Sequence, residues 1–163
     1  MIVVADASPL IFLAKIRRLD LIPALLGSDI RVPKAICREL LHSRVDPAEE
    51  ILLRQFLDSC RIEAVDKARP FASAMSAADN AALTLAVRLK AEFLLCDERI
   101  TRRMAEAEGV RPLGTLGVLL RAMRNGLLDR VETRRLIDLL VISHGFRIGV
   151  GLYQAIQAEI QRR

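Results

Sequence analysis

Short apolar runs alternate with helical stretches along the chain, and this alternation constrains the fold more than any other feature. Four runs have the length and composition of buried strands, namely IVVAD from Ile2, DIRV from Asp29, RIEAV from Arg61 and EFLLCD from Glu92. One or more helical patterns separate each run from the next. Strands separated by helices form a parallel sheet with right-handed crossovers, and the helices then cover both faces. We therefore predict an α/β fold, a three-layer α/β/α arrangement around a central parallel sheet of four or five strands.

The helical stretches have identifiable starts and stops. The sequence predicts helices over 9–16, 20–27, 33–43, 47–58, 76–90, 98–109, 114–126, 129–143 and 149–163. Proline suits the first position of a helix, where its missing N–H costs nothing, and Pro9, Pro33 and Pro47 occupy that position here. Ser8 can then cap the helix that begins at Pro9, so Asp6 is not needed as a cap and is expected to have another role.

Length and hydropathy indicate one domain with an apolar surface. At 163 residues the chain is long enough for a single domain, residues 1–163, that buries roughly two thirds of the surface exposed by its unfolded form. The sequence has no tryptophan and only 4% aromatic residues, so the core must be aliphatic. The mean hydropathy of +0.28 is high for a protein of this size and favours an apolar surface covered by a partner. We therefore expect a homodimer.

The sequence indicates a cytoplasmic protein without membrane association. Its apolar stretches are shorter than the about 20 residues that a bilayer span requires, and its start lacks a basic leader. Cys37, Cys60 and Cys96 are odd in number and far apart, which is typical of neither a disulfide framework nor a zinc site.

Positive charge is concentrated in the last third of the chain. Residues 1–98 contain 13 Lys and Arg against 14 Asp and Glu, whereas residues 99–163 contain 12 arginines against 6 acidic residues. Because arginine matches the geometry of phosphate, this surplus favours a nucleic-acid partner, although a solvated helical surface has a similar composition. Residues that would bind RNA phosphates follow the EFLLCD strand directly, namely Arg99, Arg102 and Arg103. For Arg103, an ion pair with Glu106 on a solvated helix face is the alternative to phosphate binding.

Four carboxylates are expected at one edge of the sheet. Asp6 and Asp97 each end a predicted strand, and the carboxyl ends of parallel strands share an edge where ligands bind. Glu39 borders the apolar side of the helix after the second strand, and Asp79 lies in the first turn of the helix that leads to Asp97. We expect all four side chains to converge there.

Each carboxylate also has a local structural interpretation. Asp97 would cap a helix that starts at Glu98, and Asp79 follows Ser76 by three residues, as in a capping box. Glu39 would be an ordinary solvated residue, and Asp6 would form an Asx turn. The convergence of four independent local patterns favours a shared site over these four separate explanations.

A cluster of carboxylates requires a cation. Crowding raises the pKa of some members unless a positive charge neutralises them. Oxygen-only ligands select a hard divalent ion, Mg²⁺ or Mn²⁺, which polarises a phosphate and activates water. The sequence therefore indicates metal-dependent hydrolysis of a phosphodiester. It has no phosphate loop of the Gly-x-x-x-x-Gly-Lys type and no complete dinucleotide-binding glycine pattern.

The sequence resembles a known family. The stretches VVADASPLI, AICREL, SAADNAALTLA and LLCDERITRR are similar to those of PIN domains of the DUF3368 type, which are related to VapC-like toxin ribonucleases. The resemblance extends over nearly the whole chain. It implies a ribonuclease whose catalytic and metal-binding residues are Asp6, Glu39, Asp79 and Asp97, with Ser8 supporting the first carboxylate or a metal-bound water. It also implies pairing with an antitoxin-like protein.

The sequence thus predicts an Mg²⁺- or Mn²⁺-dependent endoribonuclease that hydrolyses RNA. One alternative stays open, a catalytically inactive PIN-like module that binds RNA or a small protein partner. The position of the four carboxylates discriminates between these hypotheses, because a module that only binds does not need them together.

Overall fold

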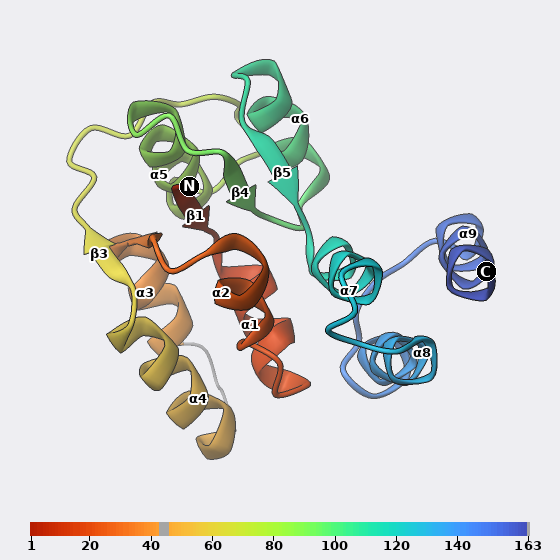
Figure 1. Cartoon of the computed structure of the whole chain (residues 1–163). Coiled ribbons are helices and arrows are strands. Elements are labelled where there is room, and N and C mark those ends of the chain that lie inside the picture. The colour runs from red at the N-terminus through yellow and green to blue at the C-terminus, as the bar shows by residue number, and fades with distance from the viewer. Residues whose placement is uncertain (43–45, 163) are drawn as a thin grey trace.

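A parallel sheet lies at the centre of the protein. The structure, a computed structural model, describes residues 1–42 and 46–162. Within these residues, five strands form one sheet in the order β3-β2-β1-β4-β5, and every neighbouring pair is parallel (Figure 1). The strands are β1 (Val3–Ala5), β2 (Ile30–Pro33), β3 (Arg61–Glu63), β4 (Phe93–Leu95) and β5 (Arg111–Leu113). The predicted α/β fold with a central parallel sheet is confirmed.

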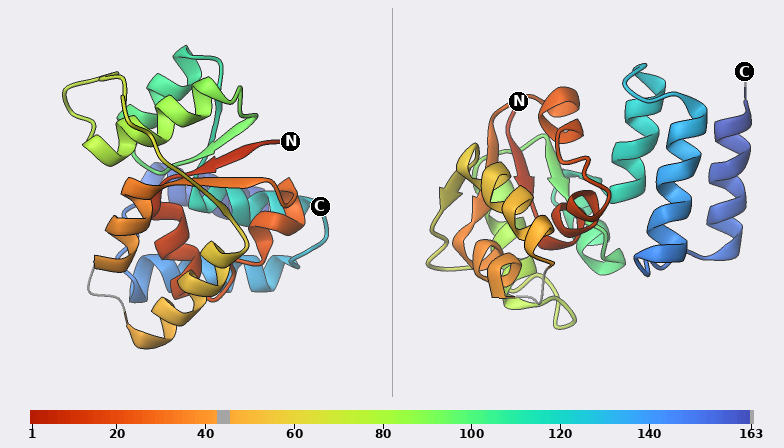
Figure 2. Two further views of the ribbon diagram at one scale, coloured as in Figure 1. Left: turned by 90° about the vertical axis from the view of Figure 1, so that its left-hand side faces the viewer. Right: turned by 90° about the horizontal axis from the view of Figure 1, so that it is seen from below.

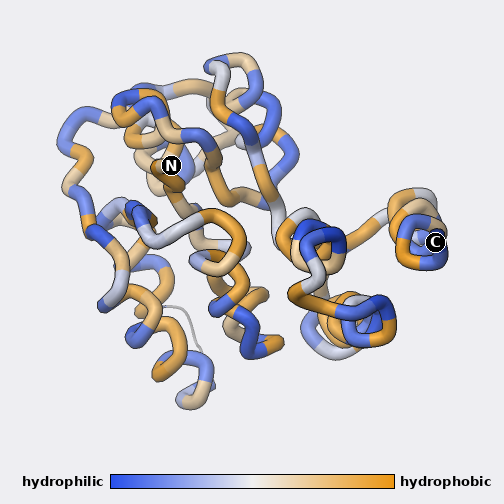
Figure 3. The backbone as a smooth tube through the Cα atoms, in the orientation of Figure 1, coloured by the Kyte–Doolittle hydropathy of each residue, from blue (hydrophilic) through white to orange (hydrophobic). Residues whose placement is uncertain are grey.

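Helices cover both faces of this sheet. In Figure 2, left, α5 and α6 lie on one side and α1 to α4 lie on the other, while the right-hand view shows α7, α8 and α9 side by side. The helices are α1 (Ala7–Lys15), α2 (Leu21–Leu26), α3 (Lys34–His42), α4 (Pro47–Asp58), α5 (Ala77–Arg88), α6 (Arg99–Ala107), α7 (Thr115–Arg124), α8 (Arg130–Asp138) and α9 (Val150–Gln161). Hydrophilic and hydrophobic segments alternate along them, as expected for helices with one buried side (Figure 3).

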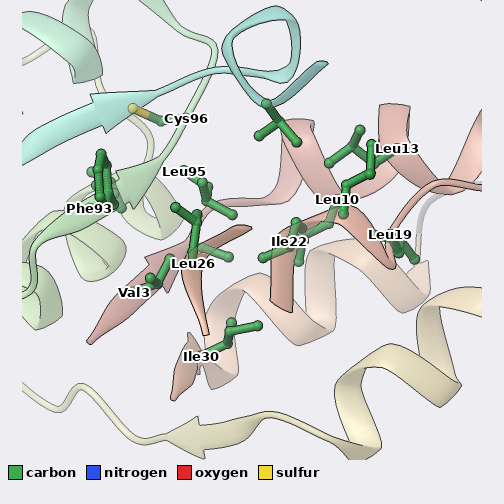
Figure 4. Close-up of a cluster of buried hydrophobic side chains, with 14 of the residues drawn as sticks. Val3, Leu10, Leu13, Leu19, Ile22, Leu26, Ile30, Phe93, Leu95 and Cys96 are labelled. Atoms are coloured by element: carbon green, nitrogen blue, oxygen red, sulfur yellow. The ribbon is translucent and has the colours of Figure 1, made fainter. Parts of the chain in front are cut away.

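The core is aliphatic, as the composition predicts. Strands β1 and β4 are buried at every position, because helices cover both faces of a parallel sheet. Figure 4 shows part of this core, where Val3 and Ile30 from neighbouring strands lie near Leu26 of α2. One aromatic contact joins distant parts of the chain: the rings of Phe12 in α1 and Phe146 before α9 meet edge to face, with centroids 4.8 Å apart.

Several predicted boundaries are wrong. Helix α1 begins at Ala7, with Asp6 and not Ser8 at the N-cap position, so Pro9 is its third residue. Pro33 ends β2 and does not begin α3. The predicted helix over 129–143 changes at Leu139 to a π-helical turn, η1 (Leu139–Ser143). The predicted helix ends at 43 and 163 lie outside the described residues.

The two outer strands are short and polar. Strand β3 has the sequence Arg61-Ile62-Glu63, and β5 contains Arg111 and Pro112.

In the part of the chain that the structure describes, no helix has the length and apolar character needed to cross a bilayer. Cys37, Cys60 and Cys96 are all free thiols.

Candidate active site

Asp6 lies at the carboxyl edge of the central strand. Strand β1 ends at Ala5, and the backbone N–H of Asp6 donates to the carbonyl of Leu95 at 2.9 Å, which aligns the ends of β1 and β4. The Asp6 carboxylate accepts a hydrogen bond from the N–H of Ala7 at 2.8 Å. Asp6 therefore caps α1, a role that the sequence pattern assigned to Ser8, and Asp6 is almost completely buried, at 3% exposure.

Asp6 has two acidic neighbours. The pKa of Asp6 is raised from 3.8 to about 8, and burial is the largest cause. The charge of Asp79, a hydrogen bond with Asp79 and the charge of Glu39 contribute to this rise, and the hydrogen bond from the N–H of Ala7 opposes it. Although Glu39 is exposed as a residue, partial burial of its carboxyl group and the charge of Asp79 raise its pKa as well. The structure thus places Asp6, directly after β1, within electrostatic reach of Asp79 in the first turn of α5 and of Glu39 within α3.

Asp79 has two roles. Its Oδ2 accepts a hydrogen bond from the N–H of Ser76 at 3.3 Å, while its own N–H donates to Ser76 Oγ at 3.1 Å. This is the capping box that the sequence offered as the structural alternative. Because a carboxylate has two oxygens with four acceptor sites, capping α5 does not prevent Asp79 from facing Asp6.

Asp97 is held by hydrogen bonds from two other elements. Ser8 Oγ and Thr115 Oγ1 donate to its Oδ2 at 2.8 and 2.7 Å, and the N–H of Thr115 donates to Oδ1 at 2.7 Å. Asp97 does not cap the helix that follows it, because α6 begins at Arg99 after Glu98. Its carboxylate lies at the N-terminus of α7 instead, where the helix dipole favours negative charge. Ser8, expected to support Asp6, contacts Asp97.

Gly114 permits this position of Asp97. A Cβ atom at Gly114 would lie 2.8 Å from Asp97 Oδ1, closer than real Cβ atoms approach other groups, and a tight 3.0 Å from Arg102 Nη1. Arg102 Nη1 also donates to the carbonyl of Cys96 at 3.3 Å. Sequence reasoning missed Gly114 and Thr115. Their signal was the glycine at the first position of the helix predicted over 114–126, directly after the segment that forms β5.

The buried thiol of Cys96 lies near Asp97 and also near two of the other carboxylates. The pKa of Cys96 is raised to about 12, mainly by burial. The charges of Asp6, Asp97 and Asp79 contribute to this rise, and the charge of Arg102 opposes it. A single buried side chain is therefore within electrostatic reach of three of the four predicted acidic residues. The fourth, Glu39, interacts electrostatically with Asp79.

The donor chemistry of this edge suits a hard cation. Within residues 1–42 and 46–162, no three acidic, histidine or cysteine side chains are already arranged as a ligand set. Mg²⁺ needs no such set, since it keeps several waters and is usually held by one or two carboxylates. The carboxylates that repel one another around Asp6 fit this requirement, because a cation would relieve their repulsion.

The predicted phosphate-binding arginines lie on α6, beside Asp97. Arg102 and Asp97 both line a pocket of about 410 Å³ that extends between α7 and α9. Arg99 and Arg103 are exposed, and neither forms an ion pair with another described residue. The alternative pairing of Arg103 with Glu106 is therefore not formed in the described part of the protein.

The parallel sheet and the carboxylates along its edge define an α/β protein with a nuclease-like fold. A family model described as a PIN domain, DUF3368, matches residues 2–162. The chain belongs to this PIN-domain family, whose members are generally nucleases that use divalent metal ions.

Comparison with solved structures supports the same fold. A PilT N-terminus domain protein from the hyperthermophilic archaeon Sulfolobus solfataricus P2 superimposes with a TM-score of 0.57 and is 16% identical in sequence. The match covers 74% of this chain and 92% of the archaeal chain. No curated protein matches the chain.

Proposed function

We propose that residues 1–163 form one PIN-like domain that hydrolyses RNA phosphodiesters as an Mg²⁺- or Mn²⁺-dependent endoribonuclease. The observation that carries this proposal is the buried Asp6 carboxyl group, whose pKa is raised to about 8 beside Asp79 and Glu39. A protein gains no stability from placing carboxylates together in this way, and such strongly shifted groups concentrate at functional sites.

Asp6, Glu39, Asp79 and Asp97 would hold the metal ion, directly or through water. When bound, the ion supplies a polarised phosphate oxygen and an activated water. The hydrogen bonds from Ser8 and Thr115 fix the orientation of Asp97 before substrate arrives. Preorganised groups of this kind need no rearrangement during the reaction.

The arginines of α6 would bind the substrate backbone. Arg102 lies next to Asp97, and the exposed Arg99 and Arg103 extend the positive surface from the same helix. Guanidinium groups bind phosphate through charge-assisted hydrogen bonds, which position the strand without reading its sequence.

Metal binding and RNA cleavage can be tested with one variant and one control. We expect millimolar Mn²⁺ to raise the melting temperature of the wild type, because it binds the folded state alone. We expect the wild type to cleave mixed RNA in Mn²⁺. Asp6→Asn should lose both effects, whereas Asp58→Asn, which changes an exposed carboxylate at the end of α4, should keep both. Equal behaviour of Asp6→Asn and wild type would overturn the proposal.

The second candidate is a PIN-like module that binds RNA or a protein without cleavage. It is favoured by the hydrogen bonds that already occupy Asp79 and Asp97. Metal-independent RNA binding without cleavage in Mn²⁺ would support it. The homodimer and the pairing with an antitoxin-like protein stay predictions, and light scattering of the purified protein tests the first.

A further inference from the structure

The pocket beside Asp97 has features that the proposed chemistry does not use. It has a volume of about 410 Å³ and lies between α7 and α9. Asp97 and Arg102 line one part of it, and the lining also includes Leu116, Phe146 and Ile156. Its size is within the range of pockets that bind small organic groups, of about 300 to 1,000 Å³. Hydrolysis of a phosphodiester alone needs no apolar cavity of this kind.

We propose that this pocket binds one nucleobase of a single-stranded RNA, adjacent to the phosphate at Asp97 and Arg102, and that Glu159 favours a base with an exocyclic amino group. This inference rests on the proposed function, since it assigns the base next to the phosphate that is cleaved.

The walls of the pocket suit the flat face of a base. Phe146 lines the pocket and remains half-buried, and its edge-to-face contact with Phe12 fixes the orientation of its ring. Single-stranded RNA is commonly bound by stacking an unpaired base on an aromatic or apolar side chain. A base within a duplex would have to leave its stack to enter a cavity between two helices.

The charges around the pocket suit a nucleotide. Arg102 and the exposed Arg147 both line it, and they provide positive charge for the phosphates on either side of the base. An uncharged lipid or an apolar peptide would gain nothing from these two arginines. We therefore favour a nucleotide over either of these occupants.

Glu159 of α9 supplies a hydrogen-bond acceptor. Both Nε and Nη2 of Arg124 donate to its Oε1, so Oε2 has no hydrogen-bond partner among the described residues. A carboxylate accepts hydrogen bonds from the amino groups of bases, as Glu and Asp do from cytosine. Uracil has no amino group, and its one donor on that edge, N3–H, lies between two carbonyl oxygens that would repel the carboxylate, which disfavours its binding.

The test uses a variant that fills the pocket and a matched control. Ala155 lines the pocket, whereas Ala158, also exposed on α9, does not. Binding of fluorescent adenosine, cytidine and uridine hexanucleotides is measured by anisotropy in EDTA, where metal-dependent cleavage cannot occur. Ala155→Trp should weaken binding of the adenosine and cytidine strands about tenfold, as loss of one stacked base requires. Ala158→Trp should change it by less than about twofold.

Base preference gives a second measurement that does not depend on filling the pocket. The wild type should bind the adenosine strand and the cytidine strand each about fivefold more tightly than the uridine strand, and Glu159→Gln should remove this preference. Melting temperatures of all variants show that they fold. Equal affinities of Ala155→Trp and Ala158→Trp, no preference against uridine in the wild type, or no binding of any strand would each overturn the inference.

Cleavage is assayed separately, so that the two proposals fail in different ways. A wild type that binds with the expected dependence on Ala155 and Glu159, but does not cut RNA in Mn²⁺, would overturn the nuclease and support the pocket. A wild type that cuts RNA, while Ala155→Trp binds as well as Ala158→Trp, would support the nuclease and overturn the pocket.

Discussion

Asp6→Asn is expected to stabilise the metal-free protein at alkaline pH while it removes function. The protonated Asp6 shares a hydrogen bond with Asp79, and the ionised form is buried beside two acidic groups. Asparagine resembles the protonated form: its carbonyl oxygen can accept from Ala7, and its amide can donate to Asp79. The variant therefore keeps the contacts and loses the charge.

The magnitude follows from the pKa of Asp6. The difference between 3.8 and about 8 sets a ceiling of about 6 kcal/mol on the cost of ionising Asp6 in the folded state, since one pKa unit is worth about 1.4 kcal/mol. Relaxation of the surrounding structure and entry of water reduce the penalty of a buried charge well below this ceiling. We therefore expect a gain of about 2 kcal/mol at alkaline pH, which raises the melting temperature by about 4 to 8 °C for a chain of this length.

The sign of the pH dependence is determined by the direction of the pKa change. A raised pKa in the folded state means that Asp6 contributes stability below pH 3.8 and that this contribution is lost as the pH rises through about 8. The free energy of unfolding of the wild type should therefore fall between about pH 5 and about pH 9 relative to that of Asp6→Asn. Urea unfolding in EDTA, followed by circular dichroism at both pH values, measures this difference.

Asp58→Asn again serves as the control and should follow the pH profile of the wild type. Added Mn²⁺ should return the lost stability to the wild type at alkaline pH and should have no effect on Asp6→Asn. Parallel pH profiles of the wild type and Asp6→Asn in EDTA would refute the electrostatic reasoning, whatever the effect on cleavage.

Substitutions at four further positions test other parts of the structure. Gly114→Ala should cost about 1 to 3 kcal/mol in thermal unfolding and reduce Mn²⁺-dependent cleavage, because its Cβ would displace Asp97 or Arg102. Thr115→Val should cost about 1 kcal/mol in urea unfolding through loss of a hydroxyl donor, and Thr115→Ser should retain most of that stability. Leu94→Ala should cost about 2 to 5 kcal/mol in the same assay, since Leu94 is completely buried in β4. Arg103→Ala should weaken binding of all RNA strands alike and reduce the slope of log Kd against log salt by about 0.7, measured by anisotropy.

Much of the fold could be predicted because buried parallel strands have a simple sequence pattern. The runs that form β1 and β4 are continuously apolar, and both were expected as strands. Strand β5 was not expected, because its three residues, Arg111-Pro112-Leu113, form no apolar run. The segment forms a strand because its backbone pairs with β4, and this pairing joins residues that are 18 positions apart in the sequence.

The site was only partly predictable, for a related reason. Topology alone placed Asp6 and Asp97 at the same edge of the sheet. Local rules could not decide whether Asp6 or Ser8 caps α1, since both residue types suit that position. Which of the two residues caps α1 depends on Asp97, because Asp97 accepts a hydrogen bond from the Ser8 hydroxyl, 89 residues earlier in the sequence. Asp79 caps α5 and also lies beside Asp6, so its capping role does not decide between the two interpretations.

The composition of the outer strands limits how two copies of this protein can associate. An unpaired strand edge is a template for a neighbouring chain, and short length, charge and proline all oppose such pairing. Strand β3 presents Arg61 and Glu63, and β5 presents Arg111 with Pro112, each within three residues. Growth of a continuous sheet from one molecule to the next is therefore disfavoured at both ends, and self-association has to use helical surfaces.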